Sequence, residues 1–303
     1  MELQWPLILF TTLLAWAAGL FAAQCVWALR GKGARAQMPA LITSAVLLVV
    51  GGIAVFFHLE HWERIFNGFG HLSSGITQEL IAIVVLAVAA IVYLVYLRRD
   101  EGKVPAWLAV LSIALAAVLV VVMAHSYMMS ARPAWDSVLW IFYVLGNACV
   151  LGPATVALVC AIVKEPVRLA ATVALIGAAV NAVTTIVYAV TLQFLEGSFT
   201  TVGYYSDPTM PTAPLVDVTA VGNVFTGELA PLMWIGVILV GAVVPLIAAL
   251  LEKRSGATPA ADGTAVASRA ELWMAVAVIA AVIGAICMRV VFYELGASVF
   301  MLY

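Results

Sequence analysis

Hydrophobic positions along the chain form eight long runs, separated by shorter stretches that are polar or contain glycine and proline. Every run has about 20 or more mostly apolar residues, the length that an α-helix needs to cross the hydrocarbon core of a bilayer. The apolar residues are continuous and do not alternate with polar ones, so the pattern favours spanning helices over the strands of a β-barrel. The predicted helices cover about residues 6–29, 39–59, 76–97, 105–129, 136–163, 168–195, 229–251 and 270–294.

Proline and glycine positions within these runs support the same fold class. Pro39 stands at the start of the second run, and the first turn of a helix tolerates proline. Small residues such as Gly152 and Gly241 allow neighbouring helices to approach closely in lipid. We therefore predict an all-α integral membrane protein, a bundle of eight transmembrane helices in a single domain over residues 1–303. The stretch 255–268 is rich in Gly, Ala, Ser and Thr and is interpreted as a flexible linker.

The composition excludes most other classes of protein. Hydrophobic residues make up 65% of the 303 residues, and charged residues only 10%. Soluble domains are roughly 45–50% apolar and about 25% charged. So few charges cannot cover the surface of a water-soluble fold. A soluble globular enzyme, a nucleic-acid-binding protein and a disordered chain are therefore excluded, and the bilayer is the expected surroundings.

The basic residues are distributed unevenly over the connections between the predicted helices. Eleven of the 14 Lys and Arg residues lie in the first, third, fifth and seventh connections, whereas Arg64 and Arg132 lie in the second and fourth. The remaining one, Arg289, lies inside the last run. Because Lys and Arg stay on the cytoplasmic side, this bias predicts cytoplasmic odd-numbered connections. Both termini are then expected to face the outer, periplasmic side.

The four cysteines do not indicate a metal centre. Cys25, Cys149, Cys160 and Cys287 all lie inside apolar runs, and none belongs to a C-x-x-C pair. An iron–sulfur cluster or a structural zinc needs thiolates that converge at close spacing. We therefore expect no metal site in this chain.

Polar and ionisable side chains at membrane depth are costly, so each is a candidate for function. Few are present, and by the predicted topology they gather at the outer side. His58 closes the second run, Glu79 opens the third, and Arg289 lies near the outer end of the eighth. The other polar residues of this region are His61, Arg64, Asn67, His71 and His125.

These residue types suit the oxidation of a quinol, an apolar ring that carries hydroxyls at opposite ends and loses electrons together with protons. The imidazole of His58 can pair with one hydroxyl, since histidine titrates near neutral pH. The carboxylate of Glu79 can accept a proton. Arg64 or Arg289 can anchor a carbonyl or tune a neighbouring group. The aromatic residues that can sandwich the ring are Phe56, Phe57, Trp62 and Phe66.

Each candidate also has a purely structural alternative. His58 can be an interfacial histidine at a helix end. Glu79, if it lies in the first turn of its helix, can interact with the positive end of the helix dipole. Arg64 can form an exposed pair with Glu60, and Arg289 can extend along the helix to place its charge among the headgroups.

Other functions remain open on the residues alone. A bis-histidine haem needs two imidazoles on facing helices at similar depth, and His58 with His125 offers one such pair but no second. A transporter often shows inverted repeats and helices broken near the midplane, and no convincing internal repeat is present. An anchor that only tethers a partner protein is a further alternative.

Five motifs occur in order along the chain. Trp5–Thr11 reads W-P-L-x-x-F-T, and His58–Asn67 reads H-L-x-x-x-x-R-x-x-N. Glu79 supplies an acid at the start of the third helix, Gly152–Pro153 a G-P pair in the fifth, and Arg289–Tyr293 an R-x-x-F-Y sequence in the eighth. In these features the chain resembles the membrane-anchor subunit of dimethyl sulfoxide reductase and its relatives.

This resemblance implies a three-subunit enzyme of the bacterial cytoplasmic membrane. A molybdopterin catalytic subunit on the periplasmic side would reduce an S-oxide, an N-oxide or a related acceptor, and an iron–sulfur subunit would connect it to this chain. The chain itself would anchor the complex and oxidise menaquinol in anaerobic respiration, without haem and without reducing the terminal acceptor on its own. His58 and Glu79 would react with the quinol. The other quinol-binding residues would be Arg64, Asn67, Arg289 and Tyr293.

Overall fold

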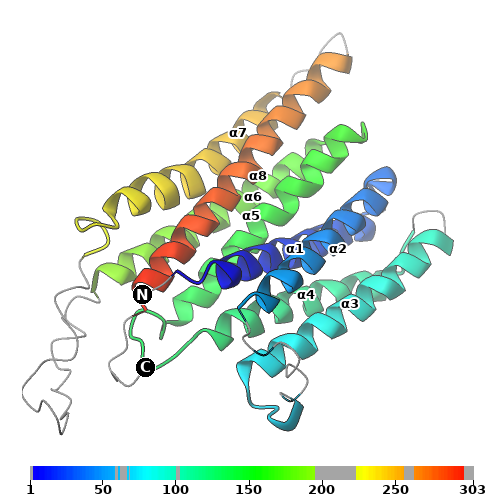
Figure 1. Cartoon of the computed structure of the whole chain (residues 1–303). Coiled ribbons are helices and arrows are strands. Elements are labelled where there is room, and N and C mark those ends of the chain that lie inside the picture. Colours follow the sequence, from blue (N-terminus) through cyan, green and yellow to red (C-terminus); the bar gives the residue numbers. More distant parts are fainter. Residues whose placement is uncertain are drawn as a thin grey trace, which may run out of the picture.

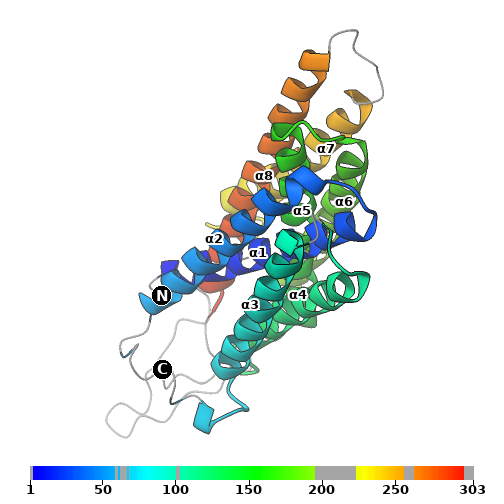
Figure 2. The ribbon, with the colours of Figure 1, turned by 90° about the vertical axis from the view of Figure 1, so that its right-hand side faces the viewer.

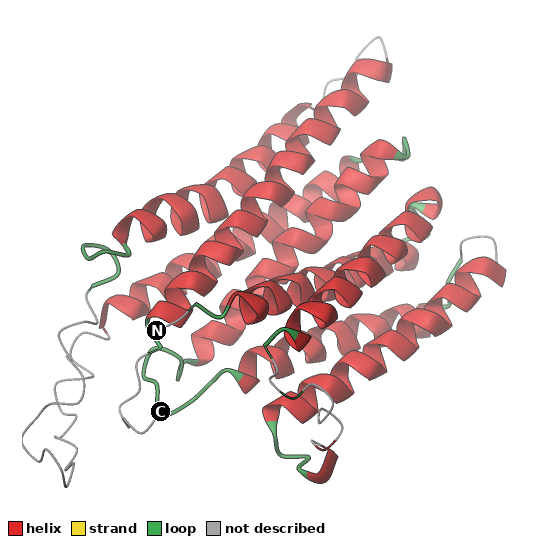
Figure 3. Ribbon diagram, viewed as in Figure 1, coloured by secondary structure: helices red, strands yellow, loops and turns green. Residues whose placement is uncertain are grey.

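The computed structural model describes residues 3–58, 61, 67, 69–99, 103–194, 223–255 and 263–296. Within these ranges the regular elements are all helices (Figures 1 and 3). Eight helical spans are long and apolar enough to cross a membrane. They confirm the predicted all-α bundle, and the chain is a multi-pass membrane protein. The elements are α1 (Trp5–Leu29), α2 (Ala34–Phe56), α3 (Gly75–Arg99), α4 (Ala106–Ser126), α5 (Val138–Ile162), α6 (Arg168–Leu192), the π-helix η4 (Leu232–Val243) continued by α7 (Val244–Ser255), and α8 (Gly263–Glu294).

Two helices begin earlier than the sequence pattern predicts. Pro39 lies inside α2 and not at its start, because the polar residues before it join the helix. One of them, Gln37, is buried against α1, where its side-chain nitrogen donates to the carbonyl oxygen of Gln24 at 3.2 Å. α8 begins at Gly263, inside the stretch interpreted as a linker. That stretch contains alanines, which have the strongest helix propensity, and it extends a long helix that is already formed.

α1 and α5 form the centre of the bundle and are its most buried spans. α1 packs against α2, α4 and α5, and α5 packs against α6 and α8 (Figure 2). The two central helices approach most closely at Gly19 and Gly152, where a Cβ added to Gly152 would lie 2.1 Å from the Gly19 carbonyl oxygen. Gly241 of η4 and Gly284 of α8 are in similarly close contact. Small residues therefore set these helix–helix distances, as is typical of packing in lipid.

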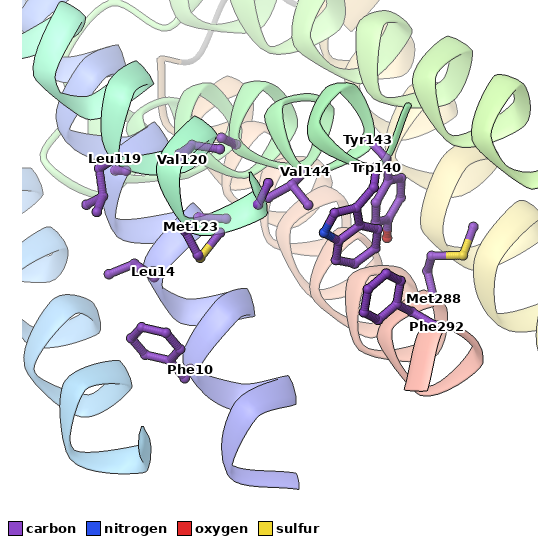
Figure 4. Close-up of a cluster of buried hydrophobic side chains, with 14 of the residues drawn as sticks. Phe10, Leu14, Leu119, Val120, Met123, Trp140, Tyr143, Val144, Met288 and Phe292 are labelled. Atoms are coloured by element: carbon purple, nitrogen blue, oxygen red, sulfur yellow. The ribbon is translucent and has the colours of Figure 1, made fainter. Parts of the chain in front are cut away.

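A large apolar core fills the space between α1, α4, α5 and α8 (Figure 4). Phe10 and Leu14 extend from α1, and Met123 comes from α4. On the opposite side, the rings of Trp140 and Phe292 stack with their centroids 4.0 Å apart and an interplanar angle of 17°. Stacked aromatic pairs of this kind join α5 firmly to α8.

α2 and α3 are the exception to this dense packing. They are the least buried of the eight spans, and they contact each other along only a few residues. α2 is held mainly by α1, and α3 mainly by α4. The space between α2 and α3 is therefore the least tightly closed part of the bundle.

The two ends of the bundle differ in charge. The last turns of α1, α3, α5 and α7 lie at one end of the bundle, and the start of α1 lies with the end of α8 at the other (Figure 1). The eleven basic residues of the odd-numbered connections are thus gathered at a single end. His58 and Glu79 belong to the opposite end.

The contact between α1 and α5 leads to a prediction about stability. Replacing Gly152 by Ala places a methyl group against the Gly19 carbonyl, and the central helices have to move apart. We expect Gly152→Ala to lower the free energy of unfolding by about 1–3 kcal/mol, the usual effect of overpacking. Thermal unfolding of the purified protein in detergent measures the change. Gly52→Ala is the matched control, because a Cβ there meets no atom within 4 Å; equal melting temperatures for the two variants would contradict the prediction.

Candidate functional site

A cavity of about 650 Å³ lies at the end of the bundle opposite the basic residues. Its walls come from α1, α2, α3 and α8, together with the end of α4 and the connection that follows it. Most of the lining is apolar. The polar side chains in the wall are those of Gln4, His58, Glu79, Ser126, Tyr127, Arg132, Trp135 and Tyr293.

Among the described residues that line this cavity, Glu79 supplies the one carboxylate. It lies in the second turn of α3, and its side chain is only 6% exposed. The buried face of α3 includes Glu79, Leu86 and Tyr93, spaced by two helical turns each, and it faces the bundle. The hydroxyl of Ser126 at the end of α4 donates a hydrogen bond to Glu79 Oε1. The alternative of a first-turn acid that interacts with the helix dipole is therefore wrong, because Glu79 is buried and bonded to another helix.

His58 lines the same cavity from the connection just after α2. The helix closes at Phe56, and the backbone N–H of His58 still donates to the Val55 carbonyl at 3.0 Å. The imidazole is exposed and lines the cavity, as does the ring of Phe56 beside it. The structure thus brings His58 and Glu79 to one site, although they belong to two helices that hardly touch.

Three aromatic residues close the inner wall. The ring of Tyr293 is edge-on to both Tyr127 and Trp135, with centroid distances of 6.5 and 5.5 Å. Trp135 donates its indole N–H to the carbonyl oxygen of Phe292 at 2.6 Å, which fixes the connection after α4 against α8. Burial raises the pKa of the Tyr127 hydroxyl well above its usual value, and the neighbouring Tyr293 and Glu79 raise it further. Tyr127 therefore stays protonated and can donate a hydrogen bond.

Arg132 adds a positive charge to the cavity wall. Its guanidinium lies 4.5 Å from the centre of the Trp135 ring and donates to the carbonyl oxygen of Gly296. Arg132 is one of the two basic residues of the even-numbered connections, on the predicted outer side, and it was not among the predicted site residues. That exception to the charge distribution was the signal that could have identified it.

Arg289 lies beneath the cavity and does not line it. It is fully buried, so the alternative of a side chain that extends to the headgroups is wrong. Its Nε donates to Thr11 Oγ1 at 2.8 Å, and its Nη1 donates to Asn147 Oδ1 at 2.9 Å. Further hydrogen bonds go to the backbone oxygens of Thr11 and Ala285. The carbonyl and amide oxygens that α1, α5 and α8 supply satisfy a charge that would otherwise be very costly at this depth.

The hydrogen bonds continue from Arg289 across the bundle. Asn147 Nδ2 donates to Asn181 Oδ1 at 3.0 Å, and Asn181 Nδ2 donates to the carbonyl oxygen of Gly241 at 3.0 Å. The chain of bonds therefore connects α1, α8, α5, α6 and η4. None of its polar side chains was proposed from the sequence except Arg289, since single Asn and Thr residues inside apolar runs are inconspicuous.

The other predicted residues are placed less centrally. Tyr293 lines the cavity, but Asn67 is exposed and is not one of the lining residues. His125 is exposed in the last turn of α4 and is likewise not in the wall, so it does not share the cavity with His58 as a haem pair would require. Arg64, like Trp62 and Phe66, lies outside the described residues.

The arrangement can bind a flat, mostly apolar ligand with polar groups at its edges. Binding sites for small molecules are mostly apolar concavities with a few well-placed polar groups, and this cavity matches that description. A carboxylate and an imidazole lie on different walls, so they can contact different parts of one ligand. Aromatic faces are available to pack against a ring.

The fold and the cavity together define a multi-pass membrane protein with a ligand-sized site between its helices at one end of the bundle. Its family follows from a comparison with known families. Residues 1–259 match the family described as DMSO reductase anchor subunit (DmsC), so the chain belongs to this family of membrane anchor subunits and the resemblance is confirmed. An anchor subunit implies partner catalytic subunits. A comparison with curated proteins finds no match.

The buried hydrogen bonds lead to a prediction about stability. Replacing Asn147 by Leu removes an acceptor from Arg289 and a donor from Asn181, and it leaves both groups buried without that partner. We expect Asn147→Leu to lower the free energy of unfolding by about 1–3 kcal/mol. Thermal unfolding in detergent is the measurement.

Thr172→Val serves as the control for this substitution. It removes a hydroxyl that donates to the carbonyl of Arg168 within the same helix, at an exposed position. A melting temperature for Asn147→Leu that matches this control would show that the buried bonds do not stabilise the bundle.

Proposed function

We propose that this chain anchors a molybdopterin oxidoreductase complex and oxidises menaquinol in the cavity formed by α1, α2, α3 and α8. The observation that carries the proposal is the cavity itself. It is largely apolar, it lies at one end of the spanning helices, and both His58 and Glu79 line it, from different helices. Membership of an anchor-subunit family supports an association with catalytic partners.

The proposed chemistry divides between two side chains. His58 accepts a hydrogen bond and then the proton from one quinol hydroxyl, and Glu79 accepts the proton of the other as electrons leave the ring. The Ser126 hydroxyl donates a hydrogen bond to Glu79 Oε1 and so holds the carboxylate in position. Oxidation of one quinol releases two electrons and two protons and leaves the quinone. The electrons pass to an iron–sulfur subunit and from there to the molybdopterin subunit, which reduces the terminal acceptor.

Positive charges around the cavity favour an ionised quinol as it loses its protons. Arg289 lies one helical turn before Tyr293 on the same face of α8, so its fixed charge acts from beneath the aromatic wall. Arg132 lines the cavity directly. Arg64 is proposed as a further charge of this kind on the strength of its motif. These positive charges stabilise the ionised form of the quinol, and the Glu79 carboxylate accepts a proton from it.

The orientation of the complex is proposed from the charge at the two ends. Eleven basic residues gather at the end opposite the cavity, and basic residues prefer the cytoplasmic side. The cavity and both termini then face the periplasm of a bacterial cytoplasmic membrane, where the iron–sulfur and molybdopterin subunits would bind. Electrons would have a short path to these partners, and the anchor would need no haem to carry them across the bilayer.

Replacing the proposed proton acceptor tests this function. Glu79→Gln keeps the shape of the side chain but removes its basicity, so we expect menaquinol-dependent turnover of the purified complex to fall roughly 100-fold. Turnover with a reduced viologen dye, which supplies electrons directly to the iron–sulfur subunit, should stay at the level of the unchanged complex. Both rates are measured on the same preparation by following acceptor reduction.

Glu294→Gln is the matched control, because this exposed glutamate near the end of α8 is not a lining residue of the cavity. It should leave both rates unchanged. Full menaquinol turnover in Glu79→Gln would disprove the role of Glu79. Complete absence of quinol oxidation in the unchanged complex, with normal assembly, would indicate a purely structural anchor.

A further inference from the structure

A second cavity, here called the α2/α3 groove, lies deeper in the bundle than the first and has a volume of about 220 Å³. α1, α2 and α3 form its walls. Its described lining residues are apolar except for Ser44, whose hydroxyl already donates to the carbonyl oxygen of Ala17 at 2.8 Å. The groove thus presents hydrocarbon to whatever occupies it. The lining residues used below are Leu48, Val49, Leu86, Ala87, Ala90 and Ile91.

The groove lies directly below the cavity that holds His58 and Glu79, here called the outer cavity. On α2, Gly52 lines the outer cavity and Val49 lines the groove; on α3, Ile83 lines the outer cavity and Leu86 the groove. The two members of each pair are three positions apart, which is less than one helical turn, or about 4.5 Å along the helix. A Cβ added to Gly52 would meet no atom within 4 Å, so the junction between the cavities has free space on the α2 side.

The groove also opens sideways to the surroundings of the bundle. Val49 and Ile91, on its opposite walls, are 59% and 61% exposed. In a bilayer this opening faces lipid. A hydrophobic molecule can therefore enter between α2 and α3 without crossing water.

We propose that the α2/α3 groove binds the isoprenoid tail of the quinol whose ring occupies the outer cavity. This inference rests on the proposed function and names the part of the substrate that the function leaves unplaced. An isoprenoid tail is a long, methyl-branched hydrocarbon chain without polar groups, and the groove offers an apolar path that begins one turn from the ring site. From Ile83 to Leu94 the path along α3 is about 16 Å long, enough for several isoprenoid units.

The sparse packing of α2 on α3 has a role in this arrangement. The tail takes the place of side-chain contacts that these two helices do not make with each other. Because lipid is as apolar as the groove, the gain comes from close packing and not from leaving water. The groove therefore selects quinols with a tail by shape, and it aligns the ring with His58 and Glu79.

Filling the groove tests the proposal with two substrates. Ala90→Phe places a ring in the path, and we expect it to raise the KM for long-chain menaquinol about tenfold, since tail and ring then compete for the same space. The KM for a naphthoquinol without an isoprenoid tail should not change. Both values are measured with the purified complex in proteoliposomes, and Ala87→Leu gives a smaller obstruction in case the larger one disturbs assembly.

Val88→Phe is the matched control on the same helix. Val88 is exposed and is not a lining residue, so the added ring faces lipid and both KM values should stay as they are. Equal effects of Ala90→Phe on the two quinols, or no effect on either, would overturn the proposal. A loss of co-purified phospholipid without a change in KM would overturn it as well, because the groove would then hold a lipid chain.

Failure of this inference can be told apart from failure of the proposed function. If Glu79→Gln abolishes quinol turnover while the groove variants behave like the control, the ring site stands and the tail lies elsewhere. If the unchanged complex oxidises no quinol, the function itself fails. The two experiments therefore fail independently.

Discussion

The fully buried charge of Arg289, inside an apolar bundle, is the constraint on which the rest of the structure depends. A guanidinium at this depth is tolerated only where oxygen acceptors surround it. Those acceptors come from α1, α5 and α8, and the hydrogen bonds of Asn147 extend the group to α6 and η4. Five elements, from the first helix of the chain to the last, must therefore meet at one depth and in one rotation. Apolar packing alone leaves such choices less definite, because lipid competes equally well for apolar surface.

The same constraint divides the bundle into a densely packed part around Arg289 and a sparsely packed part between α2 and α3. α8 is fixed by Arg289, and Tyr293 one turn later is therefore held in the cavity wall, where Trp135 and Tyr127 pack around it. α2 and α3 take no part in these hydrogen bonds and pack sparsely against each other. Both cavities have their outer walls on these two helices. The space for a ligand thus arises where the polar network ends.

The sequence predicted the fold class well because continuous apolar runs leave few alternatives once they reach membrane length. It also predicted that His58 and Glu79 would lie at one end of the bundle, since they terminate and begin consecutive spans. It did not predict the depth of Arg289. A position near a helix end permits either an interfacial or a buried charge, and only the neighbouring helices decide between them. Tyr127 and Trp135 were missed for a related reason, because aromatic residues near helix ends are common as interfacial anchors.

A membrane-soluble substrate places a requirement on the fold that a water-soluble one does not. Under the proposed function, a quinol cannot reach the cavity through an aqueous opening, because its tail stays in the bilayer, so a pair of helices has to leave a lateral gap. Dense packing at that gap would stabilise the bundle but would exclude the substrate. In this chain the stabilising contacts are concentrated around Arg289, Trp140 and the Gly19–Gly152 approach, on the side away from α2 and α3. Under the proposed function, the weak contact between α2 and α3 is therefore a requirement for substrate access. The polar network around Arg289 offsets the stability that the sparse packing of these two helices gives up.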